Sequence, residues 1–147
     1  MVCLGNICRS PLAEGILNEK CIQNNLYWTI DSAGTGGHHV GQAPDARSRK
    51  VAQINGIDIR LQRARKINKD DIDDFDLILA MDQDNLEDLL QFFRNRTKHD
   101  KQIDLISNYS DKYKGMDIPD PYYNDNGFEH VYLMLENCIE GLIKAYR

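Results

Sequence analysis

Residues 3–10 read Cys-Leu-Gly-Asn-Ile-Cys-Arg-Ser and stand directly before an apolar-periodic run that predicts a helix. Gly5 and Asn6 lie inside this stretch, and they are the two residue types that most readily adopt positive φ. Pro11 suits the first turn of a helix. The sequence therefore predicts a tight loop leading into a helix N-terminus. Inward backbone N–H groups and the helix dipole would bind a tetrahedral oxyanion there.

Cys3 and Arg9 give this loop its expected chemistry. Arg9 can hold two oxygens of a phosphate in a bidentate contact, and the positive field favours the thiolate form of Cys3, which is a nucleophile. A cysteine and an arginine at this spacing are a weak signal alone, because a buried structural cysteine near a surface arginine gives the same pattern. The glycine, asparagine, serine and proline around them favour a phosphate loop.

The rest of the chain alternates between helical and strand-like patterns. The expected helices cover residues 10–24, 44–55, 68–74 (capped by Asn68), 82–94 and 127–146, and the expected strands cover 26–31, 76–81 and 103–106. Strands that alternate with helices predict an α/β fold with a parallel sheet.

Composition argues against several classes of function. A chain of 147 residues is one domain of common size, and a net charge of −5 without a basic block speaks against nucleic acid or anionic membrane as a partner. No apolar run approaches the length of a membrane span. Charged residues at Arg9 and Glu14 argue against a signal peptide, so a cytoplasmic location is expected.

The motifs resemble those of the low-molecular-weight protein tyrosine phosphatases. The run CLGNICRSPLAEGIL matches the signature of that family nearly residue for residue, and Asp120-Pro121-Tyr122-Tyr123 matches a second motif in the right order. Intermediate matches (31–35, 40–41, 44–45, 81–82 and 85–86) extend the resemblance over essentially the whole chain. The resemblance implies a single domain over residues 1–147 with a flavodoxin-like phosphotyrosine phosphatase I fold. That fold is a three-layer α/β/α sandwich around a short parallel sheet of about four strands.

The resemblance also implies a reaction. It is metal-independent hydrolysis of phosphotyrosine in proteins, and of small aryl phosphates, through a phosphocysteine on Cys3, without a cofactor. Asp120 would act as general acid and then as base, although an Asp-Pro pair also marks a plain turn. Inorganic phosphate or vanadate would inhibit. Phosphate would be bound by Arg9 and by the loop residues Leu4, Gly5, Asn6, Ile7, Cys8 and Ser10.

Supporting roles follow from the same resemblance. Asn6 would fix the loop, Ser32 would buttress Asn6, and Ser10 would donate a hydrogen bond to the Cys3 sulfur. The cleft for the aromatic ring would be lined by Leu4, Ile7, His38, Tyr122 and Tyr123. A histidine at position 38 departs from the tryptophan or tyrosine common in the family, and plain loop polarity is the alternative interpretation of this residue.

Cys8 has two interpretations. It is either a buried structural thiol or a redox partner that traps oxidised Cys3 as a disulfide. The other two cysteines, Cys21 and Cys138, lie on apolar helical faces and are expected in the core.

Three alternative functions stay open. Thioredoxin-coupled arsenate reductases share the loop, but they need relay cysteines, and Cys21 and Cys138 are wrongly placed for that. Arginine-phosphate phosphatases of the family tend to carry threonine at the position of Ile7. A non-catalytic phosphate-binding remnant is the third alternative.

The strand before Cys3 is expected to be largely missing. A phosphate loop of this type normally follows a strand, and only Met1 and Val2 precede the cysteine. We therefore hypothesise that Met1 is not the natural start, which mass spectrometry of the native protein would test.

Overall fold

The computed structural model describes residues 1–147 and is built around a four-stranded parallel sheet of order β2-β1-β3-β4. Its strands are β1 (Val2–Cys3), β2 (Ala33–Gly34), β3 (Ile78–Ala80) and β4 (Ile103–Leu105). Val2 pairs with Ala33 on one side and with Ala80 on the other, so the two-residue strand β1 is central. The predicted parallel α/β sheet is confirmed.

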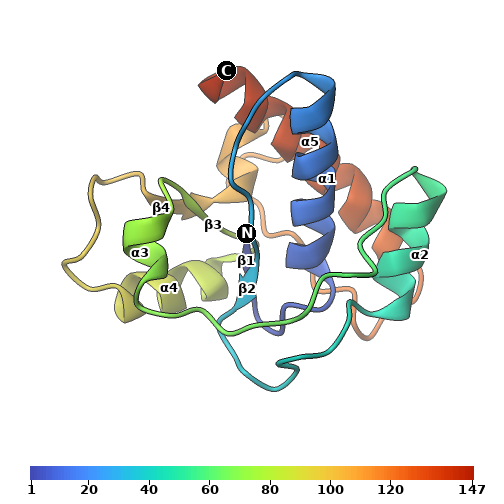
Figure 1. Ribbon diagram of the computed structural model, residues 1–147, viewed down its shortest axis with the longest axis horizontal. Helices are drawn as coiled ribbons and strands as arrows, with labels where there is room; N and C mark the ends of the chain where they lie inside the picture. The colour runs from blue at the N-terminus through green and yellow to red at the C-terminus, as the bar shows by residue number, and fades with distance from the viewer.

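The helices form two layers on opposite faces of the sheet. Figure 1 shows α1, α2 and α5 to one side and α3 and α4 to the other. Their bounds are α1 Arg9–Gln23, α2 Ala46–Ile54, α3 Asp71–Asp74, α4 Gln83–Phe92 and α5 Gly127–Tyr146, and a short 3₁₀ helix, η1, covers Ile106–Tyr109. The architecture is the expected three-layer sandwich. None of these helices has both the length and the apolar character that crossing a membrane requires.

Successive side chains of each strand pack into two different hydrophobic clusters, one on each face of the sheet. In β3, Leu79 packs into the cluster made with α1 and α5, while Ile78 and Ala80 pack into the cluster that includes Leu89 of α4. In β1, Cys3 belongs to the first cluster and Val2 to the second. Successive side chains of a strand point to opposite faces, so a buried parallel sheet needs apolar residues at every position.

The strand predicted over residues 26–31 is wrong. Those residues have no regular structure, and β2 lies instead at Ala33–Gly34, just beyond the predicted strand. A strand needs a partner backbone, and the first ladder bond on this side runs from the Ala33 N–H to the Met1 carbonyl (3.0 Å). The Tyr, Trp, Thr and Ile residues of this segment do favour strands. They form none here because no neighbouring backbone pairs with them.

Helix ends agree with expectation except at the third helix. It begins at Asp71 rather than at residue 68, and Asn68 is not its cap. The Asn68 side chain instead accepts a hydrogen bond from the Asp70 N–H (3.0 Å), forming a turn before the helix. The final helix has the predicted bounds, because its apolar stripe packs against α1 along its length.

The sheet order places the loop after β1 at a topological switch point. After β1 the chain continues into α1 on one face of the sheet, and after the adjacent strand β3 it continues into α4 on the other face (Figure 1). Ligands of open α/β sheets bind in the crevice at such a point, beyond the carboxyl ends of the strands. The Cys3 loop therefore lies where this fold opens a cleft.

Candidate active site

Asn6 holds the loop between β1 and α1 in its turned shape. Its φ of 56° is left-handed, and its backbone N–H points at the Cys3 sulfur (3.3 Å). Its buried side chain donates to Ser10 Oγ (2.7 Å) and to Ser32 Oγ (2.9 Å) and accepts from the Arg65 N–H (3.0 Å). An asparagine tolerates this backbone conformation, and three side-chain bonds to separate segments hold it there.

The hydrogen bonds of Asn6 also orient the serine hydroxyls. Because the Asn6 amide donates to both, each hydroxyl must direct its own hydrogen elsewhere. Ser32 donates to the partly buried carboxyl group of Glu14 (2.5 Å), whose pKa is raised by desolvation. Ser10 lies 3.1 Å from the Cys3 sulfur and 3.5 Å from the Ala33 carbonyl, so the sulfur is the nearer acceptor. The network ends at the Cys3 sulfur, beside the Ser10 hydroxyl, and either of these two groups can be the donor.

Arg9, the first residue of α1, is buried with 3% of its side chain exposed. Its Nη1 donates to Asp82 Oδ2 (2.5 Å) and to the Ile118 carbonyl (2.9 Å). A guanidinium has five N–H donors, so this anchoring leaves those of Nε and Nη2 for a ligand. Asp82 also caps α4 by accepting a hydrogen bond from the Asn85 N–H (2.8 Å). This bond holds the Asp82 carboxylate in the position from which it binds Arg9.

Asp120 is distant from Arg9 in sequence, but its side chain lies near the guanidinium of Arg9. Its Oδ2 lies 3.8 Å from Arg9 Nη2, and its side chain is 45% exposed. Its Oδ1 accepts a hydrogen bond from the Tyr122 N–H (3.1 Å), which is the turn expected of an Asp-Pro pair. One carboxylate oxygen therefore shapes the turn, and the other faces the arginine.

A cavity of about 350 Å³ opens above Cys3. It is lined by the loop residues Cys3, Leu4, Gly5, Ile7, Cys8 and Arg9 together with His38, His39, Asp120, Tyr122 and Tyr123. The His39 and Tyr122 rings have centroids 6.4 Å apart, and His39 Nδ1 lies 3.1 Å from Gln42 Oε1. The structure thus brings together every expected cleft residue and adds His39 beside His38. Tyr123 is the outermost, with 93% exposed.

Cys8 lies under the same cavity and is almost fully buried. Burial raises the pKa of its thiol to about 12, and the nearby charges of Asp45, Cys3 and Asp120 act in the same direction. Its carbonyl accepts a hydrogen bond from Ser48 Oγ (3.1 Å). All four cysteines are free thiols, and Cys21 and Cys138 lie in the core as expected.

Sequence reasoning missed two charged residues that support the site, Asp82 and Glu14. A usable signal existed for Asp82, because it directly follows an apolar strand run, and side chains there meet at the ligand-binding edge of a parallel sheet. For Glu14 the only signal was its spacing. It follows Ser10 by one helical turn, which places both residues on the same face of α1. Its link to the loop runs through Ser32, which no local pattern reveals.

Gly34 was also not recognised as a supporting residue, although it is where β2 meets the loop. A Cβ atom there would lie 2.6 Å from the Leu4 carbonyl oxygen and 2.9 Å from that of Gly36. These are backbone atoms, so the phosphate loop itself would have to move. Residue 34 is therefore held to glycine by close approach of the loop.

Gly34→Ala is expected to lower kcat/KM for p-nitrophenyl phosphate by on the order of 100-fold, because misplacing a reacting group by about 1 Å costs that much. Gly37→Ala is the matched control, since its Cβ would meet no backbone atom within 4 Å and only the side chains of Lys66 at 3.5 Å and Val40 at 3.9 Å. Equal activity of the two variants would contradict the role assigned to Gly34.

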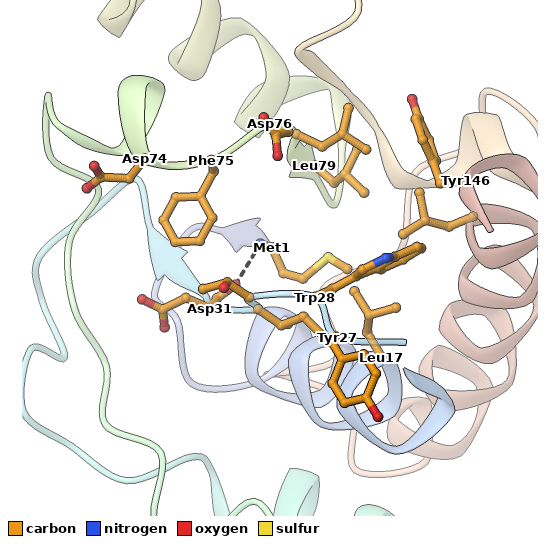
Figure 2. A pocket seen from close by; sticks show the side chains of 14 residues that line it. Met1, Leu17, Tyr27, Trp28, Asp31, Asp74, Phe75, Asp76, Leu79 and Tyr146 are labelled. Carbon is orange, nitrogen blue, oxygen red and sulfur yellow. Dashed lines mark hydrogen bonds between the residues drawn. The ribbon is translucent and has the colours of Figure 1, made fainter. Parts of the chain in front are cut away.

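A second, larger cavity of about 470 Å³ lies at the opposite end of β1 (Figure 2). Met1 lies within it and donates from its terminal nitrogen to the Asp31 carbonyl (3.0 Å). Aromatic and aliphatic side chains dominate its walls, among them Trp28 and Phe75, and the lining contains no cysteine, histidine or arginine. The nucleophile and the anion-binding groups all belong to the smaller cavity.

The chain matches known proteins over its full length. A family model described as low molecular weight phosphotyrosine protein phosphatase matches residues 1–147. The putative low molecular weight protein-tyrosine-phosphatase slr0328 of Synechocystis is 43% identical over 147 residues, covering 98% of this chain and 92% of that protein. The human low molecular weight phosphotyrosine protein phosphatase is 39% identical over 146 residues, covering 97% and 91%.

A solved structure gives the same result for the fold. The crystal structure of Drosophila arginine phosphatase matches with a TM-score of 0.92 at 33% identity, covering 99% of this chain and 95% of that one. The full-length family match, the two relatives near 40% identity and this shared fold agree with the loop geometry described above. This chain belongs to the low molecular weight phosphotyrosine protein phosphatase family.

Proposed function

We propose that this chain hydrolyses phosphotyrosine in proteins with Cys3 as nucleophile, Arg9 as phosphate ligand and Asp120 as general acid and base. The observation that carries the proposal is that these three side chains line one cavity, although Asp120 lies far from the other two in sequence. Membership of the family implies phosphoprotein substrates. The choice of tyrosine and the roles of the three residues are the proposal.

In the first step the Cys3 sulfur attacks phosphorus. An S–P bond forms while the bond between phosphorus and the phenolic oxygen breaks, and the leaving oxygen takes a proton from Asp120. The free donors of Arg9 and the inward N–H groups of residues 4–9 bind the non-bridging oxygens. These groups supply positive charge where negative charge develops, so the step calls on no metal ion.

In the second step water hydrolyses the phosphocysteine. The Asp120 carboxylate takes a proton from the water, whose oxygen attacks phosphorus, and the S–P bond breaks with its electron pair returning to sulfur. The Ser10 hydroxyl lies 3.1 Å from that sulfur and would stabilise the departing thiolate. Inorganic phosphate is the product, so phosphate and its analogue vanadate are expected to inhibit.

The shape of the cavity favours an aromatic substrate. His39 and Tyr122 both line it, with ring centroids 6.4 Å apart, and Leu4 of the phosphate loop is half-exposed. Aromatic side chains prefer to pack on other rings in offset or tilted arrangements. A phosphotyrosine ring would contact Leu4 and Tyr122 while its phosphate reaches the loop.

Phosphoarginine is the second candidate substrate, because the arginine phosphatase of Drosophila has the same fold at 33% identity. Ile7, whose side chain lines the cavity, is the residue at which the two substrate classes are expected to differ. An apolar side chain beside the phosphate group offers nothing to the guanidinium of phosphoarginine, which carries several N–H donors.

The experiment that tests the proposal compares two peptides that differ only in the phosphorylated residue, phosphotyrosine or phosphoarginine. Released phosphate is measured with a chelator present throughout. We expect higher kcat/KM for the phosphotyrosine peptide, and inhibition by vanadate. Faster release from the phosphoarginine peptide would identify phosphoarginine, instead of phosphotyrosine, as the substrate. No release from either peptide would overturn the enzymatic function.

A protective role for Cys8 is a separate proposal. Peroxide would oxidise the Cys3 thiolate to a sulfenic acid, and Cys8 would displace water from it to form a disulfide that thiols reduce. Both residues line one cavity, which favours their meeting. The pKa of about 12 opposes it, since Cys8 must lose its proton to attack.

Cys8→Ser is therefore expected to lose activity irreversibly after peroxide, while the parent recovers with dithiothreitol because its Cys3 is protected as the disulfide. Activity is measured before and after thiol treatment over the same range of peroxide concentrations. Full recovery of the variant would refute the protective role and leave Cys8 as a buried structural thiol.

A further inference from the structure

The segment that carries Asp120 has few ties to the rest of the protein. Residues 119–126, here called the acid loop, make several hydrogen bonds within themselves, such as that from the Asn124 N–H to the Pro121 carbonyl. Hydrogen bonds join the acid loop to the start of α5, where the Gly127 N–H donates to the Asn124 carbonyl (2.9 Å), and to α2, where Arg47 Nη1 donates to Asp125 Oδ1 (2.6 Å). Arg47 therefore supplies a hydrogen bond from an element that is distant in sequence, and its own contacts bear on where the acid loop lies.

Arg47 lies in the first turn of α2 and meets the acid loop in two ways. Besides its ion pair with Asp125, its guanidinium carbon lies 5.6 Å from the centroid of the Tyr122 ring. It also lies 4.6 Å from the centroid of Phe128, at the start of α5. A guanidinium over an aromatic face is attracted by the ring quadrupole. Arg47 thus contacts both ends of the turn that follows Asp120.

The other side of the guanidinium is held by Asp45, the N-cap of α2. Asp45 Oδ1 accepts from the Arg47 backbone N–H and from Nε, and Oδ2 accepts from Nη2, each at 2.9 Å. These bonds lower the pKa of the Asp45 carboxyl group, which therefore stays ionised. A bidentate pair of this kind fixes the plane of the guanidinium.

The first turn of α2 is in turn attached to the phosphate loop. The Asp45 N–H donates to the Ile7 carbonyl (2.8 Å), and Ser48 Oγ donates to the Cys8 carbonyl (3.1 Å). A continuous set of contacts therefore runs from the loop that holds the nucleophile, through Asp45 and Arg47, to the loop that holds Asp120.

We propose that Arg47 is a positioning residue for Asp120, and that it sets the place of the general acid relative to the phosphate loop. The inference rests on the proposed function, in which Asp120 protonates the leaving group. Asp120 itself lies 3.8 Å from Arg9 without a hydrogen bond to it, so that contact does not orient its carboxyl group. An ion pair with an exposed partner is weak alone, and the two ring contacts add to it.

The test uses Arg47→Gln and a series of aryl phosphates whose phenols differ in acidity. Phenyl phosphate depends strongly on a proton from Asp120, whereas p-nitrophenyl phosphate has a better leaving group and depends on it less. We expect kcat/KM to fall about 10-fold more for phenyl phosphate than for p-nitrophenyl phosphate, a part of the roughly 10²–10⁴-fold that general acid catalysis contributes. Asp125→Asn, at a highly exposed position, should change the ratio in the same direction.

Arg60→Gln is the matched control. Arg60 makes the same three bonds to Asp58 that Arg47 makes to Asp45, from its N–H and Nε to Oδ1 and from Nη2 to Oδ2, but both residues are exposed. Arg60 forms its ion pair with Asp58 and does not line the cavity of the site. We expect Arg60→Gln to leave the rates of both substrates unchanged.

Asp120→Asn separates this inference from the function on which it rests. If Arg47 acts through Asp120, adding Arg47→Gln to Asp120→Asn should change the ratio of the two rates no further. Equal losses on both substrates, or a full additive loss in the double variant, would overturn the positioning role. An unchanged ratio in Asp120→Asn alone would instead overturn the role of Asp120.

Discussion

Replacing Cys3 by serine is expected to abolish turnover of p-nitrophenyl phosphate and of phosphotyrosine peptides, with kcat falling by at least about 10⁴-fold, as when other enzymes lose their nucleophile. A serine hydroxyl in this loop has no base to activate it, because the polar groups within hydrogen-bond distance of position 3, the Asn6 N–H and the Ser10 hydroxyl, include no group that is basic at neutral pH. Steady-state phosphate release measures the effect.

The Cys3→Ser variant should still fold and bind the product. Serine has nearly the shape of cysteine, and Arg9 and the loop N–H groups that bind phosphate are unchanged. We expect inorganic phosphate to raise the melting temperatures of the variant and of the parent alike. Residual turnover near the parental rate would overturn the phosphocysteine mechanism, and loss of phosphate stabilisation alone would show that the substitution disturbs the loop.

Replacing Asp120 by asparagine is expected to lower kcat/KM for phosphotyrosine peptides by roughly 10²–10⁴-fold, because asparagine cannot donate a proton to the leaving oxygen. The amide oxygen can still accept the hydrogen bond from the Tyr122 N–H that closes the Asp-Pro turn. The variant therefore removes the acid and keeps the shape of the loop.

Two measurements identify this loss as a loss of acid catalysis. The rate should become strongly dependent on the acidity of the phenol, and the limb of the pH–rate profile that reports the protonated acid should disappear. Asp117→Asn is a suitable control, because Asp117 accepts a hydrogen bond from the Gln83 N–H and does not line the cavity. A loss equal for all phenols would assign Asp120 to binding instead.

Local sequence predicted the parts of the protein that need few partners. Asn6 and the following serine and proline specify a turned loop and a helix start by their own backbone preferences, and the structure has both there, with positive φ at Asn6 and not at Gly5. The long helix at residues 127–146 was predicted with its bounds, because its apolar stripe has helical spacing throughout.

Pairing between distant segments was not predictable in the same way. Residues 26–31 have the composition of a strand but lack a ladder partner, so the strand forms at Ala33 and Gly34, where the backbone of β1 is available. Asp82 and Glu14 look like surface carboxylates in sequence. They become parts of the site only because α4 and α1 bring them to Arg9 and Ser32.

The chemistry of the phosphate loop and its place before a helix could be predicted, since both follow from residues that are neighbours along the chain. Which distant side chains complete the site follows from the folded arrangement instead. A carboxylate at position 120 reaches Arg9, and Arg47 reaches the acid loop, because parallel strands bring the loops at their carboxyl ends to one edge of the sheet. Those distances depend on packing over the whole core, which no short stretch of sequence contains.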